Sequence, residues 1–97
     1  MKFFTRKILT KENYNKALEL LNELRDKSRL EQGCIYYDLY SDVDSPYTII
    51  INEEWENLEF QQKHTQSEHF KRIVPLVAEL VKEKSPLIRF DELKEIK

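Results

Sequence analysis

The stretch that decides the fold is Tyr47-Thr48-Ile49-Ile50-Ile51-Asn52-Glu53-Glu54-Trp55. Successive side chains of a strand point to opposite faces, so three consecutive isoleucines put apolar groups on both faces. We therefore predict a strand over residues 47–55 that is covered on both sides. Residues 34–40 also alternate and are aromatic, and the sequence from Asp42 to Pro46 is typical of a turn. This short connection predicts that the two strands pair antiparallel.

The segments before this pair alternate between a strand and a helix. Residues 3–9 are rich in aromatic and β-branched side chains and predict a first strand. Apolar residues then follow at helical spacing from Tyr14 to Leu24, with Thr10 or Asn13 as the N-cap. This helix should end near residues 29–31, where Gly33 is available for a positive-φ stop.

Two helix starts follow the central strand. Asn57 can cap a short helix and Ser67 a longer one. Pro75 falls inside the longer helix and should kink or restart it. We expect that helix to end at Ser85-Pro86 and a short final strand to occupy residues 87–90.

The predicted order, β-α-β-β-α-β, is that of a ferredoxin-like α+β fold with a four-stranded antiparallel sheet. The two main helices can cover only one of the two faces of this sheet, and strand parity leaves apolar side chains on the other face. Such a patch is a liability in a monomer. We therefore predict a homodimer formed through the sheet faces, an expectation that fails if the strand 47–55 has one polar face.

Composition narrows the class of protein. A length of 97 residues predicts a single domain, 1–97, and a net charge of -2 gives no reason to expect nucleic-acid binding. One cysteine excludes a disulfide framework and a multi-cysteine zinc site. No apolar run is long enough for a membrane span, and the N-terminus is charged too early for a signal peptide. We expect a cytoplasmic protein.

Three motifs match a known family in order and spacing. Ser28 to Tyr37 is similar to S-R-x-E-x-G-C-x-x-Y, Glu53-Glu54-Trp55 to E-x-W, and His64 to Phe70 to H-x-x-S-x-H-F. Together they resemble the antibiotic biosynthesis monooxygenase (ABM) domain family over about residues 3–90. The resemblance implies a dimeric α+β barrel.

The resemblance leaves the activity open, because a fold does not specify a reaction. The family includes cofactor-free monooxygenases of quinols and polyketide anthrones, haem-degrading enzymes and an isomerase of a phosphorylated autoinducer sugar. Haem-degrading relatives place an Asn on the first strand, where this chain has Thr5, Arg6 and Lys7, which argues against that activity. Asn52 lies on the opposite strand face from Trp55, so the Asn/Tyr/Trp set of the polyketide enzymes is not matched.

His64 and Glu53 are the candidate catalytic residues. His64 shares a helix face with Phe60, so it should point toward the sheet, where a neutral imidazole can act as a general base. Glu53 shares strand parity with Ile51; a buried carboxyl there has a raised pKa and suits proton transfer or the orientation of His64. Both can equally be structural, with His64 satisfied by one hydrogen bond. Glu54 competes with Glu53, since the side that the helices cover is unknown.

Five further residues are candidates for substrate binding, each with a structural alternative. Trp55 and Phe70 can form cavity walls or core, and the Tyr37 hydroxyl can hold a substrate oxygen or simply pack. His69 lies at a helix start, where an oxyanion can bind. Arg6 can pair with a substrate anion or with an acid on a neighbouring strand. We expect no metal site, because His64 and His69 are five residues apart with no evident third ligand.

The sequence thus favours a small dimeric monooxygenase that acts on a small aromatic, quinol or polyketide-like substrate without a cofactor. Two alternatives remain: an isomerase of a small phosphorylated carbonyl compound, in which His64 and His69 exchange protons, and a non-catalytic ligand-binding dimer.

Overall fold

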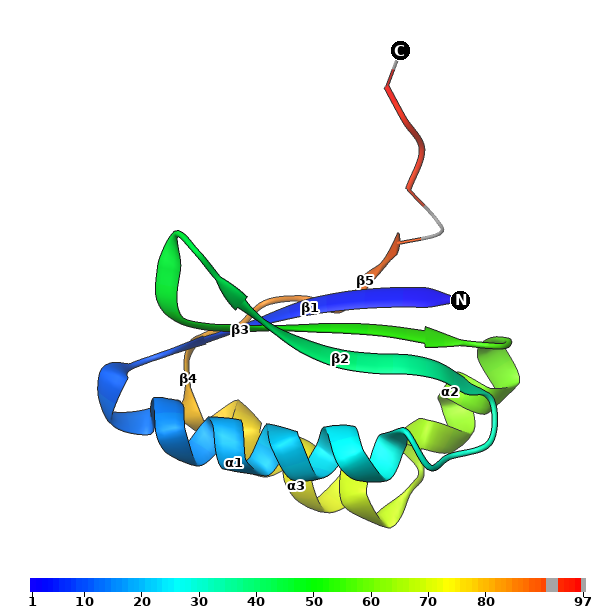
Figure 1. Ribbon diagram of the computed structural model, residues 1–97, viewed down its shortest axis with the longest axis horizontal. Coiled ribbons are helices and arrows are strands. Elements are labelled where there is room, and N and C mark those ends of the chain that lie inside the picture. The colour runs from blue at the N-terminus through cyan, green and yellow to red at the C-terminus, as the bar shows by residue number, and fades with distance from the viewer. Residues whose placement is uncertain (91–92, 97) are drawn as a thin grey trace.

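A sheet with all its helices on one side forms the molecule. The computed structural model describes residues 1–90 and 93–96. The strands and helices, in chain order, are β1 (Lys2–Leu9), α1 (Lys11–Ser28), β2 (Cys34–Asp42), β3 (Ser45–Trp55), α2 (Leu58–Thr65), α3 (Glu68–Leu80), β4 (Val81–Glu83) and β5 (Ile88–Arg89). The helices lie against one face of the sheet, and the last described residues point away from it (Figure 1). The predicted ferredoxin-like α+β class is confirmed.

All strand pairs are antiparallel, in the order β2-β3-β1-β4, and β5 also pairs with β1. The fourth strand of the fold is therefore present in two pieces on one edge of β1. The prediction that the last helix extends to Ser85-Pro86 is wrong, because it ends at Leu80 and β4 begins at once. Val81 continues the apolar stripe of the helix, but it pairs with Leu9 as a strand residue. The apolar spacing alone does not show whether Val81 belongs to the helix or to a strand.

The predicted caps begin all three helices. Thr10 accepts a hydrogen bond from the backbone N–H of Asn13, and Asn57 and Ser67 cap α2 and α3 in the same way. Pro75 does not restart α3, which is continuous. Its side chain is exposed, so water can reach the carbonyl group that loses its helical partner on that face.

Gly33 allows a close approach between the turn before β2 and helix α2. Its φ is +85°, as the sequence predicts, and a Cβ atom there would lie 2.2 Å from Cγ of Phe60. No larger residue fits without displacing the phenyl ring. The turn that carries Glu31 is consequently held against α2.

The core lies between the sheet and the helices. On β3, Ile49, Ile51, Glu53 and Trp55 are buried, which settles that the helices cover the Glu53 face and not the Glu54 face. Burial of each large apolar side chain stabilises the fold by about 1.5–3 kcal/mol.

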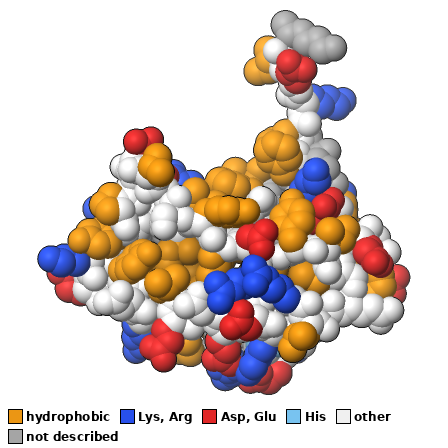
Figure 2. Space-filling view, in the orientation of Figure 1, with side chains coloured by type: hydrophobic (Ala, Val, Ile, Leu, Met, Phe, Trp, Pro, Cys, Tyr) orange, Lys and Arg blue, Asp and Glu red, His pale blue; other side chains and the backbone are white. Residues whose placement is uncertain are grey.

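The outer face of the sheet is mixed rather than uniformly apolar. Phe4, Tyr36, Tyr40, Ile50 and Phe90 border an open hollow there together with Lys2 and Asn52. Figure 2 shows hydrophobic side chains collected along the sheet, whereas charged side chains crowd the helices at the bottom of the view. Because β3 presents Asn52 as well as Ile50 outward, the sequence argument for a dimer holds for part of this face only.

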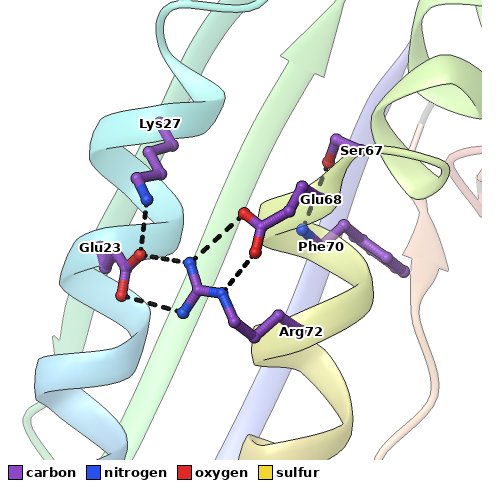
Figure 3. A network of polar contacts seen from close by, with 6 residues as sticks. All are labelled: Glu23, Lys27, Ser67, Glu68, Phe70 and Arg72. Atoms are coloured by element: carbon purple, nitrogen blue, oxygen red, sulfur yellow. Dashed lines mark hydrogen bonds and ion pairs between the residues drawn. The ribbon is translucent and has the colours of Figure 1, made fainter.

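A charged seam joins α1 to α3. Arg72 of α3 contacts Glu23 of α1 and Glu68 of its own helix, and Lys27 also contacts Glu23 (Figure 3). These side chains are solvent-exposed or nearly so, so the seam contributes little to stability beyond the packing beneath it.

Candidate functional site

A cavity of about 240 Å³ lies between the sheet and the helices. Its walls come from β1, β2, β3, all three helices and the link between β4 and β5. Most of its surface is apolar, but eight polar or ionisable residues also line it: Thr5, Lys7, Tyr37, Glu53, Gln61, His64, Thr65 and Ser85. An apolar cavity with a few convergent polar groups is the usual form of a small-molecule site.

Aromatic rings hold His64 in place on α2. Its side chain is 1% exposed. The Trp55 ring lies beneath it, with centroids 4.6 Å apart, and Phe70 meets it edge-on at 5.1 Å. The predicted inward orientation of this histidine is confirmed. It borders the cavity together with Tyr37, whose ring centroid is 5.6 Å away.

Glu31 fixes the tautomer of His64. The Oε2 atom of Glu31 lies 2.6 Å from Nδ1 of His64 and 2.8 Å from Nε2 of His69. A carboxylate only accepts hydrogen bonds, so both nitrogens carry protons and donate. The Nε2 atom of His64 then keeps its lone pair, and it makes no hydrogen bond to any described residue. This nitrogen is available to accept a proton.

Burial favours the neutral imidazole. Desolvation lowers the pKa of His64 from its ordinary value, and the hydrogen bond to Glu31 opposes this shift in part. A neutral histidine at physiological pH is the form that general-base catalysis requires.

Glu53 has a different partner from the one that the sequence suggested. Its Oε1 atom accepts a hydrogen bond from Nε1 of Trp55 at 2.9 Å, while Glu31 contacts His64. The hypothesis that Glu53 orients His64 is therefore wrong. Burial raises the pKa of Glu53 to about 7, although the Trp55 hydrogen bond lowers it in part. Near neutral pH this carboxyl can donate or accept a proton.

The other candidate residues occupy three kinds of position: the cavity lining, the region behind His64 and the outer surface of the sheet. Tyr37 and Phe70 line the cavity, as predicted. Trp55 is fully buried behind His64 and is outside the described lining, so its position is that of core and not of a wall. His69 contacts Glu31 and is also outside that lining. Their part in catalysis or binding stays a prediction.

Arg6 lies away from the site. It pairs with Asp42 at 3.0 Å, and strand parity places it on the outer face of β1. Of the two interpretations of Arg6, the ion pair within the sheet is observed, although Asp42 belongs to β2, which lies beyond β3 and is not a neighbour of β1. The cationic side chain at the cavity is its neighbour Lys7, on the opposite face.

Sequence reasoning missed Glu31, Thr5, Lys7 and Gln61. Glu31 stands in the first family motif, but as a turn residue it has no periodic pattern that shows its direction. Thr5 and Lys7 share parity with buried Phe3 and Leu9, a signal that was visible in the first strand.

Several buried polar groups of the cavity lack a protein partner. Thr5 is 6% exposed and Tyr37 2% exposed, yet within residues 1–90 and 93–96 neither hydroxyl makes a hydrogen bond. The Gln61 side-chain amide is in the same state. The polar atoms of these three side chains are not among the fully enclosed unsatisfied atoms, and all three residues line the cavity, so a bound molecule can reach them.

Glu31, His64 and His69 also form a group of potential metal ligands, with the ligand atoms within 4.8 Å of one another. The sequence argument against a metal rested on the lack of a third ligand, and Glu31 removes that reason. The shared oxygen, however, lies at hydrogen-bond distance from both nitrogens. Ligand atoms around a tetrahedral zinc ion would lie about 3.3 Å apart. The cluster as it stands is a hydrogen-bonded network.

The family model for antibiotic biosynthesis monooxygenases matches residues 7–76. The chain belongs to the antibiotic biosynthesis monooxygenase family. This ABM protein resembles a crystal structure of an antibiotic biosynthesis monooxygenase, with 30% identity, a TM-score of 0.85 and coverage of 90% of this chain and 92% of that one. It also resembles a conserved protein from Methanosarcina mazei Go1, with 25% identity, a TM-score of 0.86 and coverage of 90% and 86%.

Rv0793 from Mycobacterium tuberculosis, at 22% identity, a TM-score of 0.84 and coverage of 90% and 88%, shares the fold. No curated protein matches this ABM chain. Among the described residues, no helix has the length and apolar character needed to cross a membrane.

Proposed function

We propose that this ABM protein is a monooxygenase that acts on a small aromatic, quinol or polyketide-like substrate and needs no cofactor. The observation that carries the proposal is His64: a buried, neutral imidazole whose tautomer Glu31 fixes and whose Nε2 lone pair is unpartnered beside an apolar cavity. This arrangement supports removal of a proton from a phenol or enol.

Proton removal starts the reaction. Nε2 of His64 takes the proton, and the Glu31 carboxylate stabilises the imidazolium that forms, as the acid of a catalytic His–Asp pair does. The electron-rich anion then transfers an electron to O₂, and a carbon–oxygen bond forms. The product is a hydroperoxide at an activated carbon that still carries hydrogen, which is the CH₂ carbon of an anthrone or the ring CH beside the phenolate of a quinol. Loss of water leaves a carbonyl group. One oxygen atom enters the product and the other leaves as water, so the substrate supplies all four electrons.

Glu53 and Tyr37 hold the substrate oxygen in this mechanism. With a pKa of about 7, Glu53 is partly protonated at neutral pH and can donate a hydrogen bond to an oxygen that becomes negative. The unpartnered Tyr37 hydroxyl can do the same. Phe70 forms an apolar wall that excludes water from the anion.

We also propose a cytoplasmic homodimer that forms through the outer face of the sheet. Phe4, Ile50 and Phe90 give that face an apolar centre, and burial against a second copy removes it from water. The expected molar mass in solution is twice the 11.8 kDa of the chain. A concentration-independent monomer mass contradicts this part of the proposal.

Oxygen uptake tests the function. We expect the wild type to consume O₂ with a panel of quinols and anthrones, and His64→Ala to lose at least about 100-fold in kcat/KM, since a positioned base contributes 10²–10⁴-fold. Arg6→Gln is the matched control, because Arg6 lies on the outer face, and it should retain the wild-type rate. Unchanged turnover in His64→Ala overturns the mechanism.

A second candidate function keeps the same residues. Glu53, with a pKa of about 7, and His64, whose pKa burial lowers, line one cavity, so one group can give up a proton and the other can accept one. This pairing favours an isomerase of a small carbonyl compound. His69, the partner that the sequence suggested for His64, faces Glu31 instead. Isomerisation without O₂ uptake identifies this activity, and tight binding without any turnover identifies a ligand-binding dimer.

A further inference from the structure

The cavity has a second polar end on β1. Thr5 and Lys7 lie on the helix-facing side of that strand and line the cavity together with Ser85. Lys7 pairs with Ile49 of β3, whereas His64 packs on Trp55 at the other end of β3. The two polar ends are thus separated along the strand.

The break in the fourth strand places Ser85 there. β4 pairs with Ile8 and Leu9, and β5 pairs with Phe3 and Phe4. Residues 84–87 therefore pass the middle of β1 without ladder pairs, opposite Thr5 to Lys7. Ser85 and Leu87 of this link line the cavity, and Leu87 is 51% exposed, so the cavity reaches the surface at this point.

The groups at this end lack partners. Lys7 forms no ion pair or hydrogen bond with a described residue, and the charge that interacts with it is that of Glu53 in the same cavity. Desolvation lowers the pKa of Lys7, which is the sign of an ammonium group held away from water without close compensation. Thr5, two residues earlier on the same face of β1, also lines the cavity, and its hydroxyl makes no hydrogen bond with a described residue.

Lys7 is the sole Lys or Arg among the described residues that line the cavity. One ammonium group flanked by two hydroxyl groups matches a carboxylate, whose two oxygens accept several charge-assisted hydrogen bonds. A phosphate dianion fits less well, because a second negative charge would face Glu53 with no second cation.

We infer that Lys7, Thr5 and Ser85 bind a carboxylate of the substrate, so that the ABM protein acts on a hydroxylated aromatic acid. This inference rests on the proposed function and adds the substrate class. The carboxylate enters near Leu87, and the phenol lies at His64.

Binding without O₂ tests the inference apart from turnover. Calorimetric titrations under nitrogen compare 2,5-dihydroxybenzoate, hydroquinone and phenyl phosphate. We expect 2,5-dihydroxybenzoate to bind at least about tenfold more tightly than hydroquinone, the effect of one or two hydrogen bonds to a charged group. Lys7→Met should abolish this difference, Lys7→Arg should retain most of it, and Thr5→Val should reduce it.

Lys2→Met is the matched control, because Lys2 lies on the same strand but borders the outer hollow. It should bind all three compounds as the wild type does. Equal binding of the two aromatics to the wild type, or an unchanged preference in Lys7→Met, overturns the inference. Tighter binding of phenyl phosphate overturns the carboxylate assignment. A retained Lys7-dependent preference without O₂ uptake in air contradicts the proposed function alone.

Discussion

Two carboxyl groups on the helix side of the sheet have opposite properties. Glu23, on the exposed seam, is hydrogen-bonded by Arg72 and Lys27, which lower its pKa to about 2. Glu53, in the cavity, is desolvated and has a single close donor, and its pKa rises to about 7. On the surface, Arg72 and Lys27 pair with the Glu23 carboxylate. In the cavity, Glu53 has only the Trp55 hydrogen bond, so its carboxyl group remains available for proton transfer. Groups suited to acid–base chemistry are therefore found in the cavity, where ionisable side chains are buried without a partner of opposite charge that holds them in one protonation state.

The largest expected effect comes from the contact between Glu31 and His64. Glu31→Gln removes the carboxylate that holds the Nδ1 proton of His64, and kcat/KM should fall by about 100-fold. Because Glu31 raises the pKa of His64, its loss should also move the acid limb of the pH–rate profile to lower pH. A normal rate with an unshifted profile shows that Glu31 is only structural.

The second prediction, with a smaller expected effect, concerns how Glu53→Gln changes the dependence of folding stability on pH. The folded pKa of about 7 exceeds the ordinary 4.5, so the folded state retains a proton that the unfolded state loses as the pH rises. The wild type therefore loses stability between pH 4.5 and 7, by up to about 3 kcal/mol. The glutamine variant avoids this loss, so it should be more stable than the wild type at pH 8 but not at pH 4.

Urea denaturation at the two pH values measures this difference. Glu54→Gln, one residue along on the outer face, is the control and should show no such pH-dependent gain. A constant difference between Glu53→Gln and the wild type across this range means that the carboxyl is not desolvated.

Arg72→Met should have the smallest effect. The lowered pKa of Glu23 contributes stability above its ordinary pKa, and this contribution is lost as the pH falls through about 2. The variant should be slightly less stable than the wild type at pH 7, with no difference at pH 2 or in 1 M salt, since exposed ion pairs are screened. Thermal unfolding at low and high salt measures it. A large, salt-independent loss would show that the seam is part of the core.

The position of His64 could be predicted but its environment could not. Phe60 and His64 share a helix face, and this local spacing turns the imidazole inward. Glu31 is 33 residues away from His64, and nothing in the turn sequence indicates that its side chain reaches α2. The parity of Arg6 and Lys7 was readable, yet the burial of their neighbours Phe3 and Leu9 was needed to assign the two faces.

The division of the fourth strand into β4 and β5 could not be predicted from the sequence either. Val81 fits the helical stripe and pairs with Leu9 in the structure. Helix and strand propensities are too similar there, so packing against the edge of β1 decides the outcome.

The sequence by itself determined the β-α-β-β-α-β order, the three helix caps, the positive-φ glycine and the family, because these depend on neighbouring residues and on motif spacing. The tertiary structure alone decided that Glu31 fixes the tautomer of His64, that Glu53 faces the helices, and that Thr5, Lys7 and Ser85 meet in one cavity. Those contacts join distant segments, and their geometry follows only once the whole chain is packed.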